Sequence, residues 1–186
     1  MKNVRILLTE EQIQKRVKEL GNQITKDYSP ENGVTDRPVF ICTLKGAVYF
    51  FADLTKNIKR PIMIDFAKLS SYRNTTTSGE LELEQDISTD ITGRDVIIVE
   101  DIVDSGKTLK YFAELLQKRN PKSVKICAFL DKKDQHKVDI NPDYVCFDFS
   151  CGFVIGYGMD YAEKYRELPY LAEFIDLEKL DSEEEF

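Results

Sequence analysis

The chain of 186 residues lacks several features that would assign it to particular classes of protein. Its four cysteines form no Cys-x-x-Cys pair, which argues against a zinc knuckle or a thioredoxin-type motif. No segment reaches the roughly 18 apolar residues that a membrane-spanning helix needs. Basic residues are outnumbered 26 to 33, and the net charge of −7 disfavours a nucleic-acid partner, because such partners favour basic surfaces. We therefore expect neither a membrane protein nor a nucleic-acid-binding protein.

The remaining general features are typical of one globular domain spanning residues 1–186, without internal repeats or linkers. Cys42, Cys127 and Cys146 each lie in an apolar run and are interpreted as small core residues. Reduced thiols and the lack of a recognisable signal peptide favour a cytoplasmic location. The acidic run at 181–186 is predicted to be a solvent-facing tail.

Short apolar runs alternate with helical patterns along the chain. The run Thr9-Glu10-Glu11-Gln12 has the form of a capping box, and apolar residues from Ile13 to Ile24 then follow at helical spacing. Two further helices are predicted at 46–58 and 107–119, and strands at 39–44, 62–66, 96–99, 124–130 and 144–147. This alternation predicts an α/β fold with a mainly parallel twisted sheet flanked by helices.

Three of the predicted strands end in unusual chemistry: Leu44-Lys45-Gly46, the stretch 100–108, and Asp131-Lys132. Ligands of parallel sheets bind beyond the carboxyl ends of the strands, so we expect all three segments to open onto one crevice. The polar segment 70–79 and the alternating Leu81 and Leu83 predict a long hairpin. Its tip is either a mobile active-site lid or an ordinary exposed loop.

The stretch 96–108 contains Gly106-Lys107-Thr108 but is a poor phosphate-binding P-loop, because position 101 holds Asp instead of the required Gly. A different geometry fits better. Ser105, Gly106 and Thr108 would present backbone N–H groups and hydroxyls to a phosphate at a helix N-terminus. Glu100 and Asp101 would accept hydrogen bonds from sugar hydroxyls, or bind a hydrated Mg²⁺. The pattern favours a ribose 5-phosphate site over a plain helix cap.

This stretch resembles the phosphoribosyl-diphosphate signature of the type I phosphoribosyltransferases. The resemblance covers nearly the whole chain and is strongest to the bacterial hypoxanthine-guanine members. The further matching segments are Leu44-Lys45-Gly46-Ala47, Ser70-Ser71-Tyr72, Leu130-Asp131-Lys132 and 153–166. It implies a core at about 36–150, a small hood from about 1–10 and 150–180, and a mobile β-hairpin lid. It also implies a homodimer or homotetramer that uses Mg²⁺ and small-molecule substrates.

The resemblance further implies a purine-salvage transferase. The 5-phosphoribosyl group would move from its 1-diphosphate to N9 of hypoxanthine or guanine, giving IMP or GMP plus diphosphate. Asp104 would be the general base or acid at purine N7, Lys132 would recognise the 6-oxo group, Phe153 would stack on the ring, and the Val154 backbone would read the other edge. Asp160 would complete the purine-binding set. The phosphoribosyl group would be held by Glu100, Asp101, Asp104, Ser105, Gly106, Lys107 and Thr108.

The diphosphate and the metal complete the implied site. Diphosphate would be bound by Lys45, Gly46, Ser71, Tyr72 and Arg166, with the Leu44-Lys45 peptide able to adopt the cis form. Mg²⁺ would be bound by Glu100, Asp101 and Asp160. Taken singly, these residues have plainer interpretations. Lys132 beside Lys133 is also compatible with a solvated charge pair, Phe153 with a core residue, and Asp160 with the start of a helix at 162–165.

One segment departs from the family pattern. Ser150-Cys151-Gly152 stands where the family usually has an Asp-Lys pair before the stacking Phe. The preference among hypoxanthine, guanine and xanthine is therefore left open, as is the choice between a passive and a reactive Cys151. The alternatives are a phosphoribosyltransferase for another base and a non-catalytic, ligand-sensing regulator. The acidic net charge and the presence of Asp104 disfavour the regulator.

Overall fold

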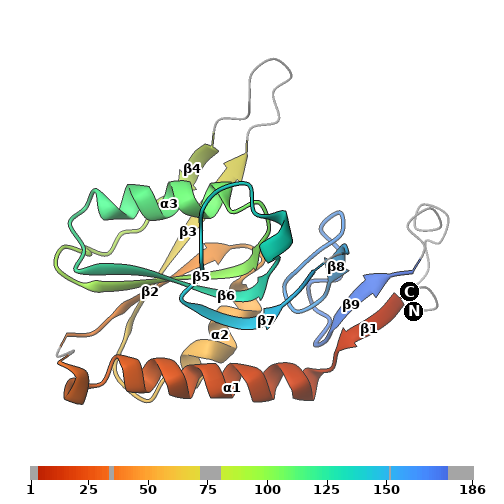
Figure 1. The fold of residues 1–186 in the computed structure, drawn as a ribbon, viewed down its shortest axis with the longest axis horizontal. Coiled ribbons are helices and arrows are strands. Elements are labelled where there is room, and N and C mark those ends of the chain that lie inside the picture. Colours follow the sequence, from red (N-terminus) through yellow and green to blue (C-terminus); the bar gives the residue numbers. More distant parts are fainter. Residues whose placement is uncertain (1–3, 34–35, 72–80, 151, 176–186) are drawn as a thin grey trace.

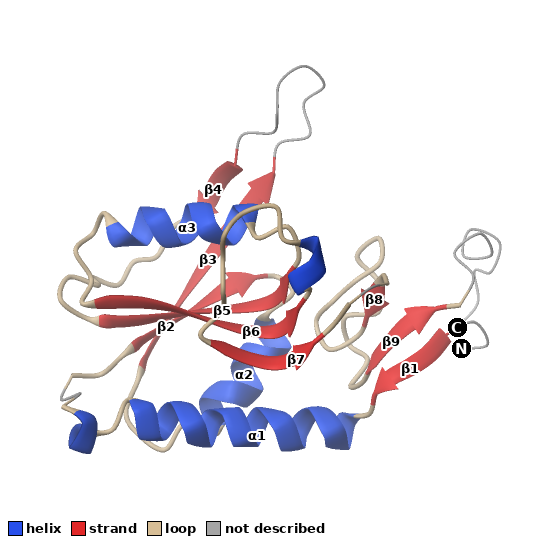
Figure 2. Ribbon diagram, in the orientation of Figure 1, coloured by secondary structure: helices blue, strands red, loops and turns tan. Residues whose placement is uncertain are grey.

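The large sheet has a parallel centre and one antiparallel edge (Figures 1 and 2). The structure is a computed structural model that describes residues 4–33, 36–71, 81–150 and 152–175. The sheet has the order β4-β3-β2-β5-β6-β7, and only the β3–β4 pair is antiparallel. Its strands are β2 (Val39–Leu44), β3 (Met63–Ser71), β4 (Leu81–Gln85), β5 (Asp95–Val103), β6 (Ser123–Asp131) and β7 (Tyr144–Asp148). The prediction of an α/β fold with a mainly parallel sheet is confirmed.

Two strands extend beyond their apolar runs. β3 continues to Ser71, and β5 continues through Glu100 and Asp101 to Val103. The prediction that β5 ends before these acids was wrong, because the backbone keeps pairing with β6 while the side chains become polar. Glu100 and Asp101 are therefore held by the sheet and not by a loop.

Helices cover both faces of the sheet, as the βαβ pattern predicts. α1 (Glu10–Asp27) and α2 (Val48–Lys56) pack on one face, and α3 (Lys107–Gln117) packs on the other (Figure 1). Side chains alternate along β2, so Phe40 belongs to the first core and Ile41 to the second. Both side chains are fully buried. The two cores fix β2 and β5 from both sides and so fix the ends of these strands.

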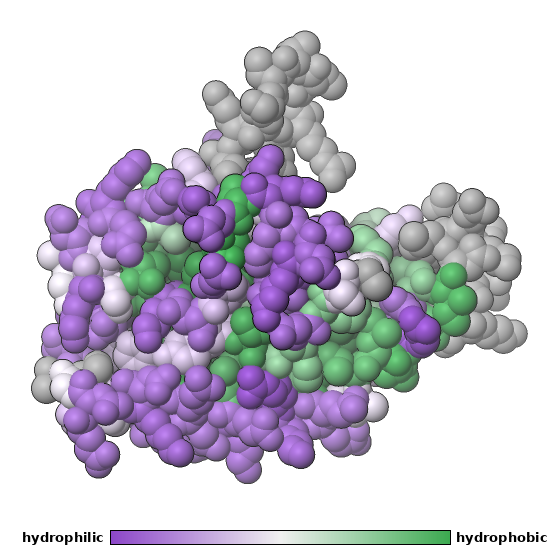
Figure 3. Space-filling view, viewed as in Figure 1, coloured by the Kyte–Doolittle hydropathy of each residue, from purple (hydrophilic) through white to green (hydrophobic). Residues whose placement is uncertain are grey.

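The start of α1 follows its sequence signals closely. The Thr9 side chain accepts a bond from the Gln12 backbone, and the Gln12 side chain accepts one from the Thr9 backbone at 2.8 Å. The apolar positions from Ile13 to Ile24 are buried, while hydrophilic side chains cover the outer face of α1 (Figure 3). The capping box and the amphipathic helix are both confirmed.

A second, three-stranded sheet lies beside the carboxyl edge of the large one. It has the order β1-β9-β8 and is antiparallel throughout, with β1 at Val4–Leu8, β8 at Val154–Ile155 and β9 at Leu171–Phe174. Apolar surface gathers beside this sheet in Figure 3. The early and late parts of the chain thus meet in one small layer, in the segments expected to form the hood.

Other expectations have mixed outcomes. Cys42, Cys127 and Cys146 are buried, and burial raises the pKa of the Cys42 and Cys146 thiols to about 12. Leu83 lies in the predicted strand β4, but the tip of the hairpin at 72–80 lies outside the described residues. No helix among the residues described is both long enough and apolar enough to span a bilayer.

Candidate active site

The carboxyl ends of three neighbouring strands form the floor of the site. β5 pairs with β2 on one side and β6 on the other. Lys45 follows β2, Lys132 follows β6, and Asp101 lies near the end of β5, so the three segments lie on adjacent strands, as predicted. The peptide between Leu44 and Lys45 is cis. A Cβ on Gly46 would lie 1.7 Å from Oδ2 of Asp101, so only glycine allows this approach of the turn to the carboxylate.

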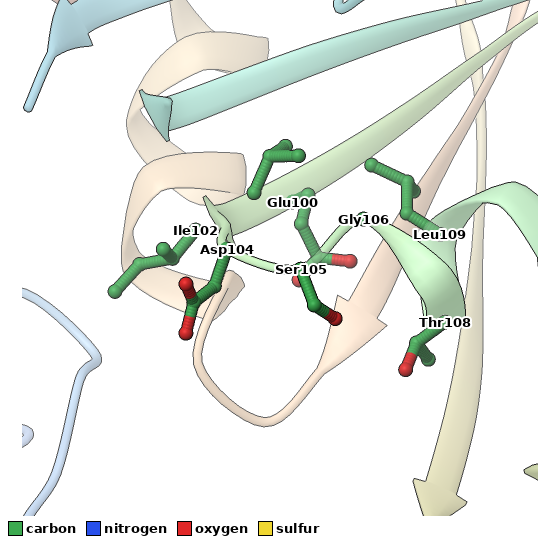
Figure 4. A pocket seen from close by; sticks show the side chains of 8 residues that line it. Glu100, Ile102, Asp104, Ser105, Gly106, Thr108 and Leu109 are labelled. Atoms are coloured by element: carbon green, nitrogen blue, oxygen red, sulfur yellow. The ribbon is translucent and has the colours of Figure 1, made fainter. Parts of the chain in front are cut away.

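The turn from β5 to α3 encloses a pocket of about 240 Å³, here called the loop pocket. Its lining residues are Glu100, Ile102, Val103, Asp104, Ser105, Gly106, Thr108 and Leu109. Figure 4 shows the Asp104 carboxylate and the hydroxyls of Ser105 and Thr108 on the same side of the turn. The predicted phosphoribosyl-binding residues therefore line one cavity, except Asp101 and Lys107. Lys107 is exposed as the first residue of α3.

The N-terminus of α3 has only a weak side-chain cap, because the backbone N–H of Lys107 donates to Oγ of Ser105 at 3.4 Å. Gly106 is the N-cap, with φ 75°, and it provides no side-chain hydrogen bond. A Cβ at this position would lie 2.5 Å from a methyl group of Ile140, so space and backbone conformation both favour glycine. The other N–H groups of the first turn and the helix dipole would favour an anion at this end of the pocket.

Two carboxylates lie side by side at the end of β5. Burial raises the pKa of the Glu100 carboxyl well above its ordinary value, and the neighbouring charge of Asp101 raises it further. The backbone N–H of Ile102 donates to Asp101 at 2.9 Å, which fixes the Asp101 side chain. Negative charge on Glu100 is therefore disfavoured in the free protein, and a bound cation or hydroxyl donor would stabilise the ionised carboxylate.

A second pocket of about 250 Å³ lies between the two sheets and is here called the inter-sheet pocket. Its lining residues are Asp101, Ile102, Asp104, Lys132, Phe153, Val154, Met159 and Asp160. Asp104 and Ile102 line both pockets. The structure therefore brings the predicted base-binding residues together and places Asp104 where the two cavities adjoin.

The two neighbouring lysines have different environments. Lys132 lines the inter-sheet pocket, and its Nζ donates to the backbone oxygen of Gly152 at 3.1 Å. Lys133 pairs instead with Asp148 at the surface, with 2.8 Å between the charged atoms. The plainer interpretation of two solvated lysines therefore does not hold for Lys132.

Phe153 is not a core residue, because 46% of it is exposed and it lines the pocket wall. Tyr161 supports it from the side, in an edge-to-face contact with 5.7 Å between ring centroids. The next residue, Val154, is buried in β8, which anchors the aromatic ring to the small sheet. A flat ligand entering the pocket would meet an available ring face.

Asp160 and Arg166 are joined in one network of charges. Arg166 lies 2.8 Å from Asp160 and donates to the backbone oxygen of Gly158 at 2.7 Å. Asp160 also accepts from the backbone of Glu163, and Lys45 pairs with Glu163 at 2.9 Å. Residues 162 and 163 form a turn that is closed by a bridge between Tyr161 and Lys164, so the alternative of a helix beginning at Asp160 was wrong.

Some predicted residues cannot be placed, and others were missed. The Ser71 side chain, Tyr72 and Cys151 lie outside what the structure describes. Ile102 and Met159 line the pockets, and Glu163 bonds Lys45, yet none of them was predicted to be in the site. If β5 had been extended to Val103, the alternation of side chains along the strand would have indicated Ile102 as a site residue. The contact of Glu163 with Lys45 joins residues far apart in the sequence, so no local pattern could have indicated it.

The comparisons with known proteins agree with this geometry. The family model described as the phosphoribosyl transferase domain matches residues 4–162. The hypoxanthine-guanine phosphoribosyltransferase of Bacillus subtilis is 48% identical over 90% of this chain and 91% of its own. That of Streptococcus thermophilus is 47% identical over the same shares. A crystal structure of the Bacillus anthracis enzyme, with HEPES in its active site, is 45% identical. It covers 91% of this chain and 97% of its own, with a TM-score of 0.84.

The mainly parallel sheet, the pocket at the turn after β5 and the second small sheet beside its edge define an α/β protein whose candidate site lies at the carboxyl ends of the strands. The chain belongs to the phosphoribosyl transferase domain family, and its resemblance to the hypoxanthine-guanine phosphoribosyltransferases is confirmed.

Proposed function

We propose that the protein transfers the 5-phosphoribosyl group of phosphoribosyl diphosphate to N9 of hypoxanthine or guanine, releasing diphosphate. The observation that carries this proposal is that Asp104 lines both pockets. One pocket has the donors for a sugar phosphate, and the other has an aromatic wall and a lysine for a 6-oxopurine. The anomeric carbon of the donor would lie where the pockets adjoin, beside the one carboxylate that they share.

In the loop pocket, the 5-phosphate binds the open N-terminus of α3 and the hydroxyls of Ser105 and Thr108. Glu100 lines this pocket and Asp101 lines the adjoining inter-sheet pocket, and both would accept bonds from the ribose hydroxyls when ionised, because ionised carboxylates only accept. Charge develops on the ribose ring as the bond to diphosphate breaks. Fixed carboxylates near the ring stabilise that positive charge without rearranging.

In the inter-sheet pocket, Lys132 donates to the 6-oxo group of the purine and Phe153 stacks on its face. Asp104 holds or removes the proton at N7, which keeps N9 nucleophilic while the new bond forms. The backbone of Val154 reads the opposite edge of the ring. Gly152 stands where the family usually has a lysine, so this site lacks that side chain beside the purine. The assay below measures which base is preferred.

The residues at the end of β5 fit a magnesium ion. The carboxyl groups of Glu100 and Asp101 are close enough for the charge of Asp101 to raise the pKa of Glu100. Mg²⁺ typically binds one or two carboxylates together with substrate oxygens. Within the described ranges, no group of three or more acidic, His or Cys side chains could form an all-protein metal site. When bound, Mg²⁺ would neutralise the diphosphate leaving group, with Asp160 as a further ligand on that side.

Diphosphate would be bound by Lys45, the backbone of Gly46 and Arg166, with Ser71 and Tyr72 contributing from the hairpin. Arg166 suits this role because its planar fork can bind two oxygens of one phosphate. A homodimer or homotetramer, expected from the family, and a cytoplasmic location, expected from the sequence, are further parts of the proposal.

A turnover assay tests the proposal. Purified protein with phosphoribosyl diphosphate and Mg²⁺ is offered hypoxanthine, guanine, xanthine and adenine in turn, and the nucleotide products are measured. We expect IMP or GMP to form faster than the adenine product by at least about 100-fold, because the site donates to the base through Lys132. Transfer to adenine alone, or to none of these bases, would contradict the proposal.

A further inference from the structure

The only histidine of the chain lies next to the proposed purine site but outside both pockets. Nε2 of His136 lies 2.8 Å from Oδ1 of Asp131. Asp131 is the last residue of β6 and is 1% exposed, and the His136 side chain is 13% exposed. A buried carboxylate requires hydrogen-bond donors, and an ionised one only accepts, so the imidazole donates through Nε2.

This pair closes a short turn that contains the 3-10 helix η2 (Lys133–Gln135). The turn is bonded at one end to the last residue of β5 and at the other end to the loop that follows β5. The backbone N–H of Lys132 donates to Val103 at 2.9 Å, and that of Lys137 donates to Ser105 at 2.9 Å. The Asp131–His136 bond therefore spans the segment that joins Lys132 to the phosphate-binding turn.

The bond matters because little else orders the Lys132 side chain. That side chain is long and flexible, and its one hydrogen bond among the described residues is to Gly152. Its direction therefore follows from the backbone on either side of it. The second oxygen of Asp131 has no partner in the described part of the chain, so loss of His136 would leave the buried carboxylate without any side-chain donor.

We propose that Asp131 and His136 are positioning residues. Their bond holds the turn so that Lys132 reaches the purine and Ser105 stays at the phosphate. Neither residue contacts substrate, and both act through their neighbours. This inference deepens the proposed function and rests on it for the role of Lys132, but the hydrogen bond itself can be tested without any activity.

The kinetic test compares His136→Ala with His136→Gln. Glutamine can donate from the position of Nε2, whereas alanine cannot. We expect His136→Ala to raise the KM for the purine about tenfold, since a bond to a buried charge is lost, and His136→Gln to restore most of it. Gln135→Ala, at an exposed position in the same turn, is the control and should leave KM unchanged. A purine KM that stays constant in His136→Ala would overturn the inference.

A double-mutant cycle separates positioning from general damage to the fold. If His136 acts through Lys132, adding His136→Ala to Lys132→Ala should change the purine KM by less than about twofold. Full multiplication of the two effects would instead mean that His136 acts independently of Lys132, and the inference would be wrong.

A spectroscopic test does not depend on catalysis. Because the chain has one histidine, its imidazole gives one set of nitrogen-15 signals. We expect the Nε2–H tautomer in the free protein and a clear shift of these signals in Asp131→Ala. Identical signals in both proteins would show that the bond is absent in solution. An inactive wild-type protein with the expected signals would contradict the proposed function and leave the bond established.

Discussion

Lys45 lies 2.9 Å from Glu163, so a residue proposed to bind diphosphate is already paired with an anion of the same chain. Both side chains are largely exposed, at 55% and 65%. Glu163 also lies 3.3 Å from Arg166, and the two cations lower the pKa of its carboxyl. If Lys45 and Arg166 bind diphosphate as proposed, the diphosphate has to displace this carboxylate or bind beside it.

Replacing Glu163 by Gln should strengthen binding of phosphoribosyl diphosphate. We expect its KM to fall about two- to fivefold, within the range for exposed ion pairs, and the gain to shrink as salt is added. Glu167→Gln makes the same change in net charge at a nearby exposed position and should have a smaller effect. Steady-state kinetics at two ionic strengths provide the measurement. A KM that rises in Glu163→Gln would mean that this carboxylate assists binding.

Glu100→Gln should raise the free energy of unfolding while lowering the proposed transferase activity. A carboxyl whose folded pKa is raised contributes stability below its unfolded pKa and loses it as pH rises toward the folded value. The free energy of unfolding of the wild type should therefore drop relative to that of Glu100→Gln as pH increases. The drop is on the order of 1 kcal/mol for each pH unit by which the folded pKa exceeds the unfolded one. Denaturant unfolding between pH 5 and 8 measures this difference, with exposed Glu114→Gln as control. A difference that does not change with pH would rule out the explanation.

Asp104→Asn should separate binding from chemistry. The amide keeps the size of the side chain but cannot take a proton from N7, so we expect kcat to fall by about 10²–10⁴-fold. Binding of the nucleotide product, measured by calorimetry, should change much less. Full turnover by this variant would remove Asp104 from the mechanism.

Gly106→Ala should disrupt the phosphate turn beyond the ordinary effect of its backbone. Gly93 is the matched control, because its φ of 68° is close to the 75° of Gly106 and a Cβ there meets nothing within 4 Å. Gly93→Ala should cost about 1–2 kcal/mol of unfolding free energy. Gly106→Ala should cost about 1–3 kcal/mol more, through the clash with Ile140, and should raise the KM for phosphoribosyl diphosphate. Equal losses in the two variants would mean that Ile140 moves aside freely.

Local signals in the sequence predicted much of the fold. The capping box at Thr9 and the apolar spacing of α1 act within a few residues, so they could be interpreted without the fold. The end of β5 was misjudged because its backbone pairing with β6 outlasts its apolar side chains. Strands β1 and β9 were not predicted as strands, since each is stabilised by a partner from the far end of the chain.

The candidate site divides in the same way. The stretch 100–108 carries its chemistry in consecutive residues, and the prediction of one shared crevice followed from the ends of parallel strands. The partners of these residues were beyond sequence reasoning. Glu163 reaches Lys45 across more than a hundred residues. His136 bonds Asp131 only because the turn between them folds back on itself.

The pairing of β1 with β9 also sets an order of events during synthesis. Val4 is paired with Phe174, so the first strand emerges from the ribosome long before its neighbour exists. At about 5–20 residues per second, the delay is on the order of ten seconds or more. The large sheet can assemble in that interval, whereas the wall bearing Phe153 gains its supporting strand last. In a nascent chain, the loop pocket proposed to bind the sugar phosphate would thus form before the small sheet that supports Phe153 in the proposed purine pocket.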